Sequence, residues 1–425
     1  MIKILSFNEM DKNDLFIRDI AVTQVGDRVS EIIAQVREKG DFALIDYAKR
    51  FDRADITEVE VTEKEIEDAF SKVSPKLIEV IKKAAKNIEA FHRNQVRSGF
   101  ITSSDSGAVC GQLVLPIEKV GLYVPGGTAA YPSSVLMNCI PAKLAGCKLI
   151  AMTTPPSADG SINPAILVAA KIAGVDRIFK SGGAQAIAAL CYGTQTVPAV
   201  DKIVGPGNAY VAEAKRQVFG KVAIDMIAGP SEILVVADSK SDPRFVAADL
   251  LSQAEHDRMA SAVLVTDSSD FAKAVQAELE VQIPLLARAD IARESIDKNG
   301  KIIVADDINQ AIDVANELAP EHLEICTDSP FDLLSRVKNA GSVFLGRYCP
   351  EALGDYLAGP NHTLPTSGTA RFSSPLSVDD FVKKTQYTYF TKSALEEVYL
   401  DVDTFAKAEG LTAHAKSATI RFEVE

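Results

Sequence analysis

Histidine is scarce in this chain, and its placement indicates where chemistry could occur. Four of the five histidines stand in short polar clusters: Gln253-Ala-Glu-His256-Asp257, Pro320-Glu321-His322, Gly359-Pro-Asn-His362 and Thr412-Ala-His414. Neighbouring carboxylates, amides and turns adjust an imidazole for metal binding or proton transfer. The fifth, His92, lies beside Phe91 in a helical pattern over 75–97. We predict that His92 is a helix-surface residue without a chemical role.

Two residues of the first cluster have a spacing that suits metal binding. Gln253 and His256 are three positions apart at the end of a predicted helix over 243–255, so their side chains would share one helix face. An amide is an unusual zinc ligand, and the pair alone could equally be a hydrogen-bonded helix end. Asp355, just before a long loop, and His414, in the C-terminal tail, could complete a metal site.

The adjacent residues Glu321 and His322 suit proton transfer. They stand at the start of a predicted strand over 322–326. Since neighbouring residues of a strand point to opposite faces of the sheet, we expect these two side chains to have separate roles and not to converge on one point.

Three glycine-rich turns follow predicted strands: Val124-Pro-Gly-Gly127, Ser181-Gly-Gly183-Ala-Gln185 and Gly205-Pro-Gly207-Asn208-Ala-Tyr210. The third comes nearest to the pattern G-x-G-x-x-G, with Tyr210 in place of the last glycine. A single turn of this kind is more often a tight connection without a ligand. We nevertheless expect the three turns to gather at the carboxyl edge of one parallel sheet, where α/β folds bind nucleotides.

These residues need elements to position them, and the apolar periodicity predicts an alternation of strands and helices. Residues 1–100 are predicted to be helical, with a capping box at Thr62 and Glu65 and a helix start at Ser74-Pro75. Strands are then predicted over 108–116, 120–124, 149–152, 177–179, 202–204, 233–237, 262–266, 301–304, 322–326 and 342–345. Helices are predicted over 133–145, 162–173, 184–191, 208–218, 243–255, 270–288, 308–318 and 331–338. This alternation indicates two α/β units with parallel sheets.

Two segments near the C-terminus depart from this alternation. Residues 359–375 are rich in Gly, Pro, Ser and Thr and contain His362, and loops of this length are usually functional or mobile. Residues 377–425 are predicted to form a small tail unit, mainly helical, that carries Glu409 and His414.

Composition excludes several classes of protein. A length of 425 residues predicts two or more domains, and a hydrophobic share of 47% without an uninterrupted apolar stretch predicts a globular protein with no membrane partner. The formal net charge of -13 makes a nucleic-acid partner unexpected. The six cysteines, at 110, 139, 147, 191, 326 and 349, form no disulfide framework or CxxC pair. Without a signal-peptide pattern at the N-terminus, we expect a cytoplasmic enzyme with reduced thiols.

Six motifs, in order along nearly the whole chain, resemble the histidinol dehydrogenase family. They are Tyr-Val-Pro-Gly-Gly at 123, Ala-Gly-Pro-Ser-Glu-Ile at 228, Leu-Leu-Ser-Gln-Ala-Glu-His-Asp at 250, Ala-Pro-Glu-His-Leu-Glu at 319, Gly-Pro-Asn-His-Thr-Leu-Pro-Thr at 359 and Leu-Thr-Ala-His-Ala at 411. The resemblance implies an NAD-dependent oxidation of L-histidinol through L-histidinal to L-histidine, the last step of histidine biosynthesis. It also implies one zinc ion per subunit and a homodimer with shared active sites.

The resemblance further implies a fold of two incomplete Rossmann-like α/β domains, in an aldehyde-dehydrogenase-like architecture, with small N-terminal and C-terminal helical pieces. We expect an N-terminal arm over 1–20 and an NAD-binding domain over 119–232. A discontinuous domain with the zinc and catalytic residues would comprise 21–118 and 233–375. The tail over 376–425 would complete the partner's site.

Residue by residue, the resemblance places the zinc ligands at Gln253, His256, Asp355 and His414. Besides these ligands, the implied substrate contacts are Ser231, His322, His362 and Glu409. The implied NAD contacts are Tyr123, Gln185 and Asn208, and the implied general bases are Glu321 and His322.

These residue types suit the implied reaction. An imidazole with a pKa near 7 can take the hydroxyl proton as hydride leaves for NAD, and a carboxylate can activate the water that adds to the aldehyde. Zinc with open positions would anchor the imidazole and amine of histidinol. Three alternatives stay open: a zinc hydrolase that uses the same ligands with Glu321, a thiol-dependent aldehyde dehydrogenase that uses Cys139 or Cys147, and a non-catalytic binding protein. We predict that both cysteines are buried, since they lie in or beside the apolar helix 133–145.

Overall fold

The computed structural model describes residues 1–9, 25–126 and 130–423, and it divides into two compact units. Unit 1 consists of Met1–Gln95 and Ile117–Phe381, and unit 2 consists of Val96–Pro116 and Val382–Glu425. Within the described ranges, none of the helices is long and apolar enough to cross a membrane.

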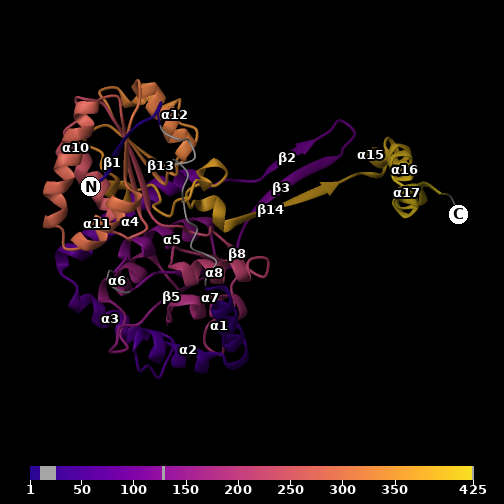
Figure 1. Ribbon diagram of the computed structural model, residues 1–425. Coiled ribbons are helices and arrows are strands. Elements are labelled where there is room, and N and C mark those ends of the chain that lie inside the picture. Colours follow the sequence, from indigo (N-terminus) through magenta and orange to yellow (C-terminus); the bar gives the residue numbers. More distant parts are fainter. Residues whose placement is uncertain (10–24, 127–129, 424–425) are drawn as a thin grey trace. The chain divides into compact units, whose positions relative to one another are not determined.

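Unit 1 is built on two parallel sheets (Figure 1). Sheet B has the strand order β6-β5-β4-β7-β8, with β4 Lys119–Tyr123, β5 Leu149–Thr154, β6 Arg177–Lys180, β7 Lys202–Val204 and β8 Ala223–Ile224. Sheet A has the order β1-β11-β10-β9-β12-β13, with β1 Lys3–Ser6, β9 Glu232–Ala237, β10 Ser261–Thr266, β11 Lys301–Val304, β12 His322–Cys326 and β13 Ser342–Leu345.

The two sheets share one topology. In each, the chain enters at a central strand, β4 or β9, adds two strands on one side and then crosses to add two on the other side. This is the winding of a Rossmann fold without its last strand, so the predicted pair of incomplete Rossmann-like units is confirmed. Strand β1 pairs with β11 at the outer edge of sheet A, so the N-terminal residues 3–6 are not the helical piece that we expected.

Helices cover both faces of sheet B. On one face lie α3 Glu63–Lys72, α4 Pro75–His92, α5 Pro132–Ala145 and α6 Pro164–Ala173; on the other lie α1 Gly26–Lys39, α2 Asp41–Tyr47, α7 Gly183–Tyr192 and α8 Ala209–Val218. Both faces are apolar because a parallel sheet is buried on each side. The capping box at Thr62 and Glu65 and the Ser74 cap of α4 are confirmed.

Sheet A is covered in the same way. Ile233 and Val235 face α9 Pro243–Ala254, α10 Ser269–Gln282 and α11 Ala289–Asn299, whereas Leu234 and Val236 face α12 Ile308–Leu318. The predicted helix over 270–288 is wrong beyond residue 282. There Pro284, which cannot donate a backbone hydrogen bond, lies in a short 3-10 turn, η5 Ile283–Leu285, and α11 begins afresh.

His92 contradicts our prediction of a surface position, because it is fully buried at the end of α4. Its Nδ1 lies 2.7 Å from Gln95 Oε1, and its Nε2 lies 3.5 Å from Asn361 Nδ2. Asn361 belongs to the loop 359–375, which packs over this helix and donates from Asn361 to the carbonyl of Met137 in α5 at 2.7 Å. Helical periodicity cannot reveal cover supplied by a loop that is distant in sequence.

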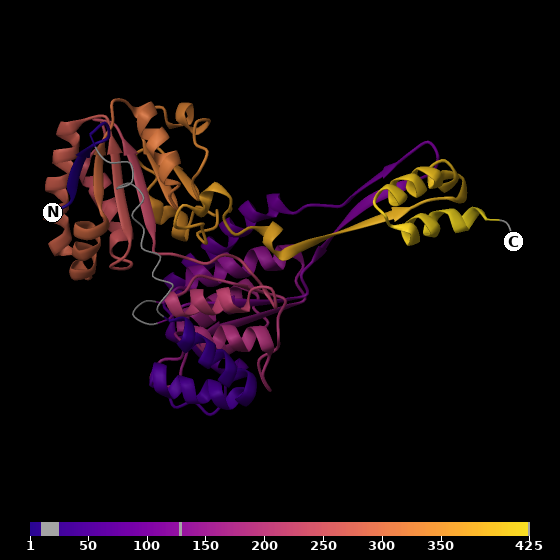
Figure 2. The ribbon, with the colours of Figure 1, turned by 45° about the vertical axis from the view of Figure 1, so that its right-hand side comes forward.

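Unit 2 is a three-stranded antiparallel sheet with small helices. Its strand order is β14-β3-β2, with β2 Phe100–Ser103, β3 Val109–Pro116 and β14 Val382–Tyr389. The helices are α15 Lys392–Glu396, α16 Tyr399–Ala408 and α17 Thr412–Thr419, and α16 and α17 pack side by side (Figure 2). The prediction of a mainly helical tail is therefore wrong over 382–389. That strand is exposed and polar, so it lacks the apolar alternation by which strands are recognised.

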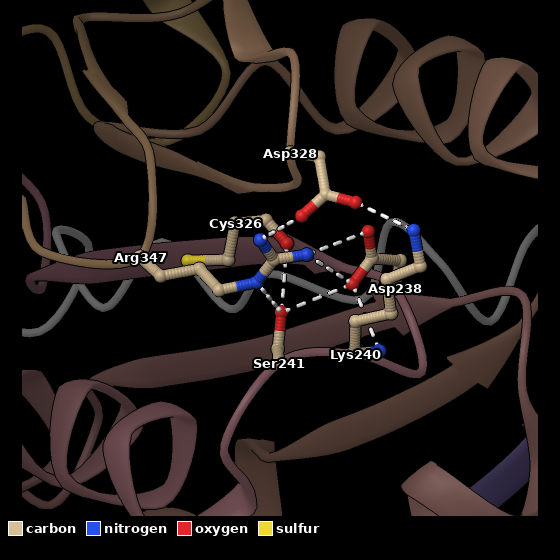
Figure 3. Close-up of polar contacts among 6 residues, drawn as sticks. All are labelled: Asp238, Lys240, Ser241, Cys326, Asp328 and Arg347. Atoms are coloured by element: carbon tan, nitrogen blue, oxygen red, sulfur yellow. Dashed lines mark hydrogen bonds and ion pairs between the residues drawn. The ribbon is translucent and has the colours of Figure 1, made fainter.

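An ion-pair network occupies the carboxyl edge of sheet A between β9 and β12 (Figure 3). Arg347, just beyond β13, donates to both carboxylate oxygens of Asp238 at 2.7 and 2.8 Å and to Asp328 at 2.5 Å. Its Nε also donates to Ser241 Oγ, which in turn donates to the carbonyl of Cys326 at 2.8 Å. The strand order reverses between β9 and β12, which is where an open α/β sheet offers its ligand crevice. In sheet A, protein side chains take up this place.

Candidate active site

The predicted bases lie at the opposite, amino edge of sheet A, where β9 and β12 run side by side. The backbone N–H of Glu232 donates to Glu321 Oε2 at 2.9 Å, and His322 Nδ1 lies 2.9 Å from the carbonyl oxygen of Glu232. Because a carbonyl only accepts hydrogen bonds, His322 carries its proton on Nδ1. Its Nε2 is therefore left as a proton acceptor.

The expectation that Glu321 and His322 would not converge is wrong. Glu321 Oε2 and His322 Nδ1 are 3.7 Å apart. Strand β12 begins at His322, so Glu321 precedes the strand and is not bound by the alternation of faces. Both side chains instead meet on the backbone of Glu232.

Two carboxylates on one short helix face His322. Glu351 and Asp355 stand one turn apart on α14 Glu351–Tyr356. Glu351 Oε1 lies 3.9 Å from His322 Nε2, and Asp355 Oδ1 lies 3.4 Å from Nδ1 of His362. One ligand atom from each of His322, Glu351 and Asp355 lies within 4.8 Å of the others, a spacing that could hold a metal ion.

The other predicted metal ligands of unit 1 lie beside this cluster. Gln253 is buried near the end of α9 and hydrogen-bonds Glu351. His256 lies beyond the helix, which ends at Ala254, and its backbone N–H donates to the carbonyl of Gln253 at 3.1 Å. The predicted end of this helix at residue 255 is thus within one residue of the observed end, and a turn after the helix carries His256. Ser231 directly precedes the start of β9.

His362 links the cluster to the helices of sheet B. Its Nε2 lies 3.2 Å from the hydroxyl of Ser134, in the first turn of α5. The loop that carries it is fixed on both sides, because Asn361 and Thr363 are buried and both hydrogen-bond residues of α5. The long loop is therefore packed in place.

Glu409 and His414 lie in unit 2. Glu409 directly follows α16, His414 lies in the first turn of α17, and both residues are exposed there. Their predicted roles at the substrate and the metal stay predictions.

Burial dominates the electrostatics of the cluster. It raises the pKa of Glu321 well above the ordinary value, and it raises the pKa of Glu351 to about 8 with help from nearby Asp355. Burial lowers the pKa of His322 to about 4, with His256 and His362 contributing in the same direction, so the ring is neutral at pH 7. Burial opposes ionisation of Asp355 as well, but the hydrogen bond from His362 holds its pKa below the ordinary range. The cluster therefore contains a neutral imidazole among carboxyl groups of unequal basicity.

The three glycine-rich turns do gather at one sheet edge, as predicted. They surround a cavity of about 770 Å³ at the carboxyl edge of sheet B, which is lined by Tyr123, Gln185 and Asn208 among others. Tyr123 Oη accepts the backbone N–H of Gly183 at 3.1 Å, and Asn208 caps α8. Strand order reverses between β4 and β7, so this cavity occupies the crevice expected for a ligand.

Gly205 has a structural reason of its own in the third turn. Its φ is +118°, and a Cβ there would lie 2.0 Å from the carbonyl oxygen of Tyr123. The glycine therefore lets the turn after β7 pass close to the end of β4.

Sequence reasoning missed several residues at both places. At the cluster they are Glu232, Glu351 and Ser134, and at the cavity they include Arg28, Phe51 and Asp52. Glu351 could have been found, since it precedes Asp355 by four positions on a helix. The others carry no signal of spacing that points to them.

Cys139 and Cys147 are buried in the core under sheet B, as predicted. Burial raises the pKa of the Cys139 thiol to about 12 and that of Cys147 to about 11. A thiol with so high a pKa is a poor nucleophile at neutral pH, so neither residue suits thiol-dependent aldehyde oxidation.

Two doubly wound sheets, a crevice cavity on one and a histidine–carboxylate cluster on the other define an α/β enzyme of the dehydrogenase class. Residues 17–422 match the family model of histidinol dehydrogenase. The chain is 56% identical over 395 residues to histidinol dehydrogenase of Clostridium acetobutylicum, covering 93% of this chain and 92% of that protein. It is 52% identical over 430 residues to that of Syntrophotalea carbinolica, with 100% of both chains covered.

A solved structure agrees with these sequence matches. The crystal structure of histidinol dehydrogenase from Elizabethkingia anophelis superposes with a TM-score of 0.94 at 40% identity, covering 99% of this chain and 98% of that one. The chain belongs to the histidinol dehydrogenase family, a family of oxidoreductases.

A second carboxyl pair, of buried Glu324 and half-buried Asp249, lies next to the cluster. Glu324, on β12, accepts the backbone N–H of Glu351 at 2.7 Å and shares a hydrogen bond with Asp249 on α9. Burial raises the pKa of Asp249 to about 6 and that of Glu324 well above its ordinary value. Burial thus favours a proton shared between these two carboxyls.

This pair predicts a pH-dependent stability. A carboxyl whose pKa is raised on folding contributes stability at low pH that is lost as the pH rises through the folded-state pKa. Between pH 5 and pH 8, the free energy of unfolding should therefore fall by about 1 to 3 kcal/mol more in the wild-type protein than in the variant Glu324→Gln. The glutamine of this variant is a neutral hydrogen-bonding partner for Asp249. Urea denaturation at both pH values measures the difference. Asp270→Asn, at an exposed carboxylate, should behave as wild type, and equal losses in all three proteins would contradict the shared proton.

Proposed function

We propose that this chain oxidises L-histidinol through L-histidinal to L-histidine with two molecules of NAD in turn, at a site that holds zinc. The single observation that carries the proposal is the state of His322. Its Nδ1 proton is fixed on the carbonyl of Glu232, and its Nε2 is open toward the carboxylates of α14. An imidazole held in this way is a positioned general base.

The donor set of the cluster fits zinc. Gln253, His256 and Asp355 offer an amide oxygen, an imidazole nitrogen and a carboxylate oxygen. Asp355 has metal-ligand spacing to Glu351 and His322, and Glu351 Oε1 is buried without a hydrogen-bond partner among the described residues. A buried carboxylate oxygen without a partner is costly unless a cation or proton satisfies it. We propose that His414 supplies the fourth ligand. Zinc, when bound, would hold the imidazole and amine of histidinol and so orient the substrate.

The cavity on sheet B fits a dinucleotide. Its volume of about 770 Å³ is in the range of cofactor sites, and the N-terminus of α7 at Gly183 opens into it. A helix N-terminus favours a pyrophosphate, so Tyr123, Gln185 and Asn208 are proposed contacts of NAD. NAD, when bound, would accept the hydride that leaves the carbinol carbon.

In the first oxidation, His322 Nε2 takes the hydroxyl proton of histidinol while the carbon–hydrogen bond breaks with its electron pair. The ring is neutral at pH 7, so Nε2 is free to accept this proton. Burial lowers the pKa of His322 below the value near 7 that we expected, whereas the carboxylate of Asp355 raises it and favours the protonated ring. Ser231, Glu409 and His362 are proposed to hold the polar groups of the substrate. His362 is positioned for this by Ser134 and Asp355.

In the second oxidation, Glu321 takes a proton from the water whose oxygen adds to the aldehyde carbon, and His322 returns the proton of the first step to the aldehyde oxygen. His322 then takes a hydroxyl proton of the hydrate, while the hydride of the hydrate would leave to a second NAD. Burial makes Glu321 a stronger base than an exposed carboxylate once it is ionised. The Glu232 N–H fixes its Oε2, so the other oxygen is the one proposed to meet the water. A zinc hydrolase would use the same cluster, but it would leave the cavity on sheet B without a role.

The first test is metal removal. A chelator should abolish NADH formation from histidinol and NAD, and added zinc should restore it, while far-UV circular dichroism stays nearly unchanged because both sheets have apolar cores of their own. His256→Asn should lower the affinity for the metal roughly 10- to 100-fold. Elemental analysis should then find less metal bound per subunit. Unfolding on chelation would make the metal structural, and no NADH from metal-replete protein would exclude the dehydrogenase.

The second test separates the two bases. Glu321→Gln should slow the oxidation of supplied histidinal by about 100-fold or more while affecting the oxidation of histidinol less, since only the second step needs water. His322→Asn should slow both steps. Single-turnover NADH formation from each substrate measures the two rates, with Glu317→Gln on α12 as a control. Equal losses in both steps for both variants would show that the roles are not divided in this way.

We also propose that each active site is completed by the tail of a partner subunit. Unit 2 carries Glu409 and His414 and exposes many large apolar side chains for its size, among them Phe100, Ile101, Leu113, Tyr389, Leu400, Phe405 and Ile420. Such a surface on a small unit is typical of an interface between chains. In a symmetric dimer the exchange is reciprocal, so each tail would serve the other subunit's cluster.

Subunit mixing tests this arrangement. His256→Ala and His414→Ala, each inactive alone, are unfolded and refolded together. In a mixed dimer with shared sites, one site carries both defects and the other carries neither, so random pairing should restore about a quarter of wild-type sites. Zinc-dependent NADH formation measures the recovery. If each site lies within one chain, no activity returns even after subunit exchange is confirmed by differently tagged chains.

A further inference from the structure

Asp52 is a carboxylate in the cavity of sheet B that the residues described so far do not explain. It is the last residue of a π-helical turn, η3 Ala48–Asp52, and it lines the cavity with its neighbour Phe51. Arg53, which follows, has a φ of +58°, in the left-handed region that non-glycine residues seldom adopt. Short π-helical turns and such backbone conformations are both enriched at functional sites.

The carboxylate of Asp52 lacks a protein partner for one oxygen. Its Oδ2 is covered from solvent and has no hydrogen-bond partner in the part of the chain that the structure describes. Burial raises the pKa of Asp52 to about 6, with no cation to oppose it. Hydrogen-bond donors on a molecule bound in the cavity would satisfy this oxygen.

Flat groups surround this end of the cavity. The Arg28 guanidinium lies over the rings of Phe51 and Tyr210, at 5.8 and 5.7 Å from their centroids, and donates to Tyr210 Oη at 3.2 Å. All three residues line the cavity. Aromatic and guanidinium planes stack well on a purine base.

Another part of the cavity lining is connected to the reacting groups through α5. There the lining residue Ala130 precedes α5, whose Ser134 contacts His362. The nicotinamide must approach that part, so the adenosine half of the dinucleotide belongs at Phe51 and Asp52.

We propose that Asp52 accepts hydrogen bonds from the ribose hydroxyls of the adenosine half of NAD and thereby excludes the 2′-phosphorylated dinucleotide. This assignment rests on the proposed function. Hydroxyl groups supply the donors that the carboxylate lacks, whereas a phosphate on the same ribose would bring a second negative charge against the carboxylate of Asp52. The residue that reads the ribose thus comes from the N-terminal helical layer and not from a strand of sheet B.

Binding measured by coenzyme fluorescence tests the assignment without turnover. The chain contains no tryptophan, so the emission of NADH and NADPH can be followed without indole fluorescence. Dissociation constants are measured for wild type, Asp52→Asn, Asp52→Ala and the control Asp55→Asn. Asp55 lies three positions further on with its side chain 86% exposed, so its variant removes the same charge outside the cavity. Displacement by AMP and by adenosine 2′,5′-bisphosphate reports the adenosine half alone.

Wild type and Asp55→Asn should prefer NADH to NADPH, and AMP to the bisphosphate. Asp52→Asn and Asp52→Ala should weaken the binding of NADH and of AMP roughly 10-fold, because a charged hydrogen bond is lost. The preference for NADH over NADPH and the preference for AMP over the bisphosphate should each fall by at least the same factor. Thermal unfolding checks that the variants are folded. If both variants keep the wild-type affinities and preferences, the role of Asp52 is overturned while the NAD site stands. If wild type binds neither dinucleotide, the proposed function and this assignment both fall.

Discussion

The backbone of Glu232 is the contact on which the cluster depends. Its N–H holds Glu321 and its carbonyl holds His322, so one peptide group positions both predicted bases. The position of Glu232 is fixed in turn by the parallel register of β9 and β12, in which His322 pairs with Ile233. Shifting that register by one residue would move the two bases away from each other and from α14. The central pairing of sheet A therefore sets the geometry of proton transfer.

The same winding serves two different purposes in unit 1. In sheet B the crevice at the strand reversal stays open as a cavity, whereas in sheet A the corresponding edge is occupied by Arg347 with Asp238 and Asp328. These ion pairs connect the loops that follow β9, β12 and β13. The histidine–carboxylate cluster lies at the amino edge of the same sheet. Topology thus supplies two possible crevices, and side chains decide which of them can receive a ligand.

Much of this fold could be predicted from apolar periodicity, because buried parallel strands and amphipathic helices both carry strong patterns. The parts that could not be predicted lack such patterns. Strand β14 is polar and exposed, and β1 is a four-residue edge strand. His92 and Glu351 are surrounded by segments that are far away in sequence. Glu321 and His322 likewise meet on the backbone of Glu232, which is distant in sequence. The residues that we propose as ligands, Gln253, His256 and Asp355, were visible in the sequence, but the turn that carries His256 was not.

The electrostatics of the cluster explain why its pieces belong together. Glu321, Glu351 and Asp355 are carboxyls gathered around a neutral His322, and burial disfavours charge on the first two. Such a group is stable only if protons or a cation compensate it. A metal ion, or the amine of a substrate, would supply positive charge, lower the pKa of these carboxyls and make Glu321 available as a base. Binding and activation are then one electrostatic event, which ties the proposed zinc ligands to the proposed proton acceptors.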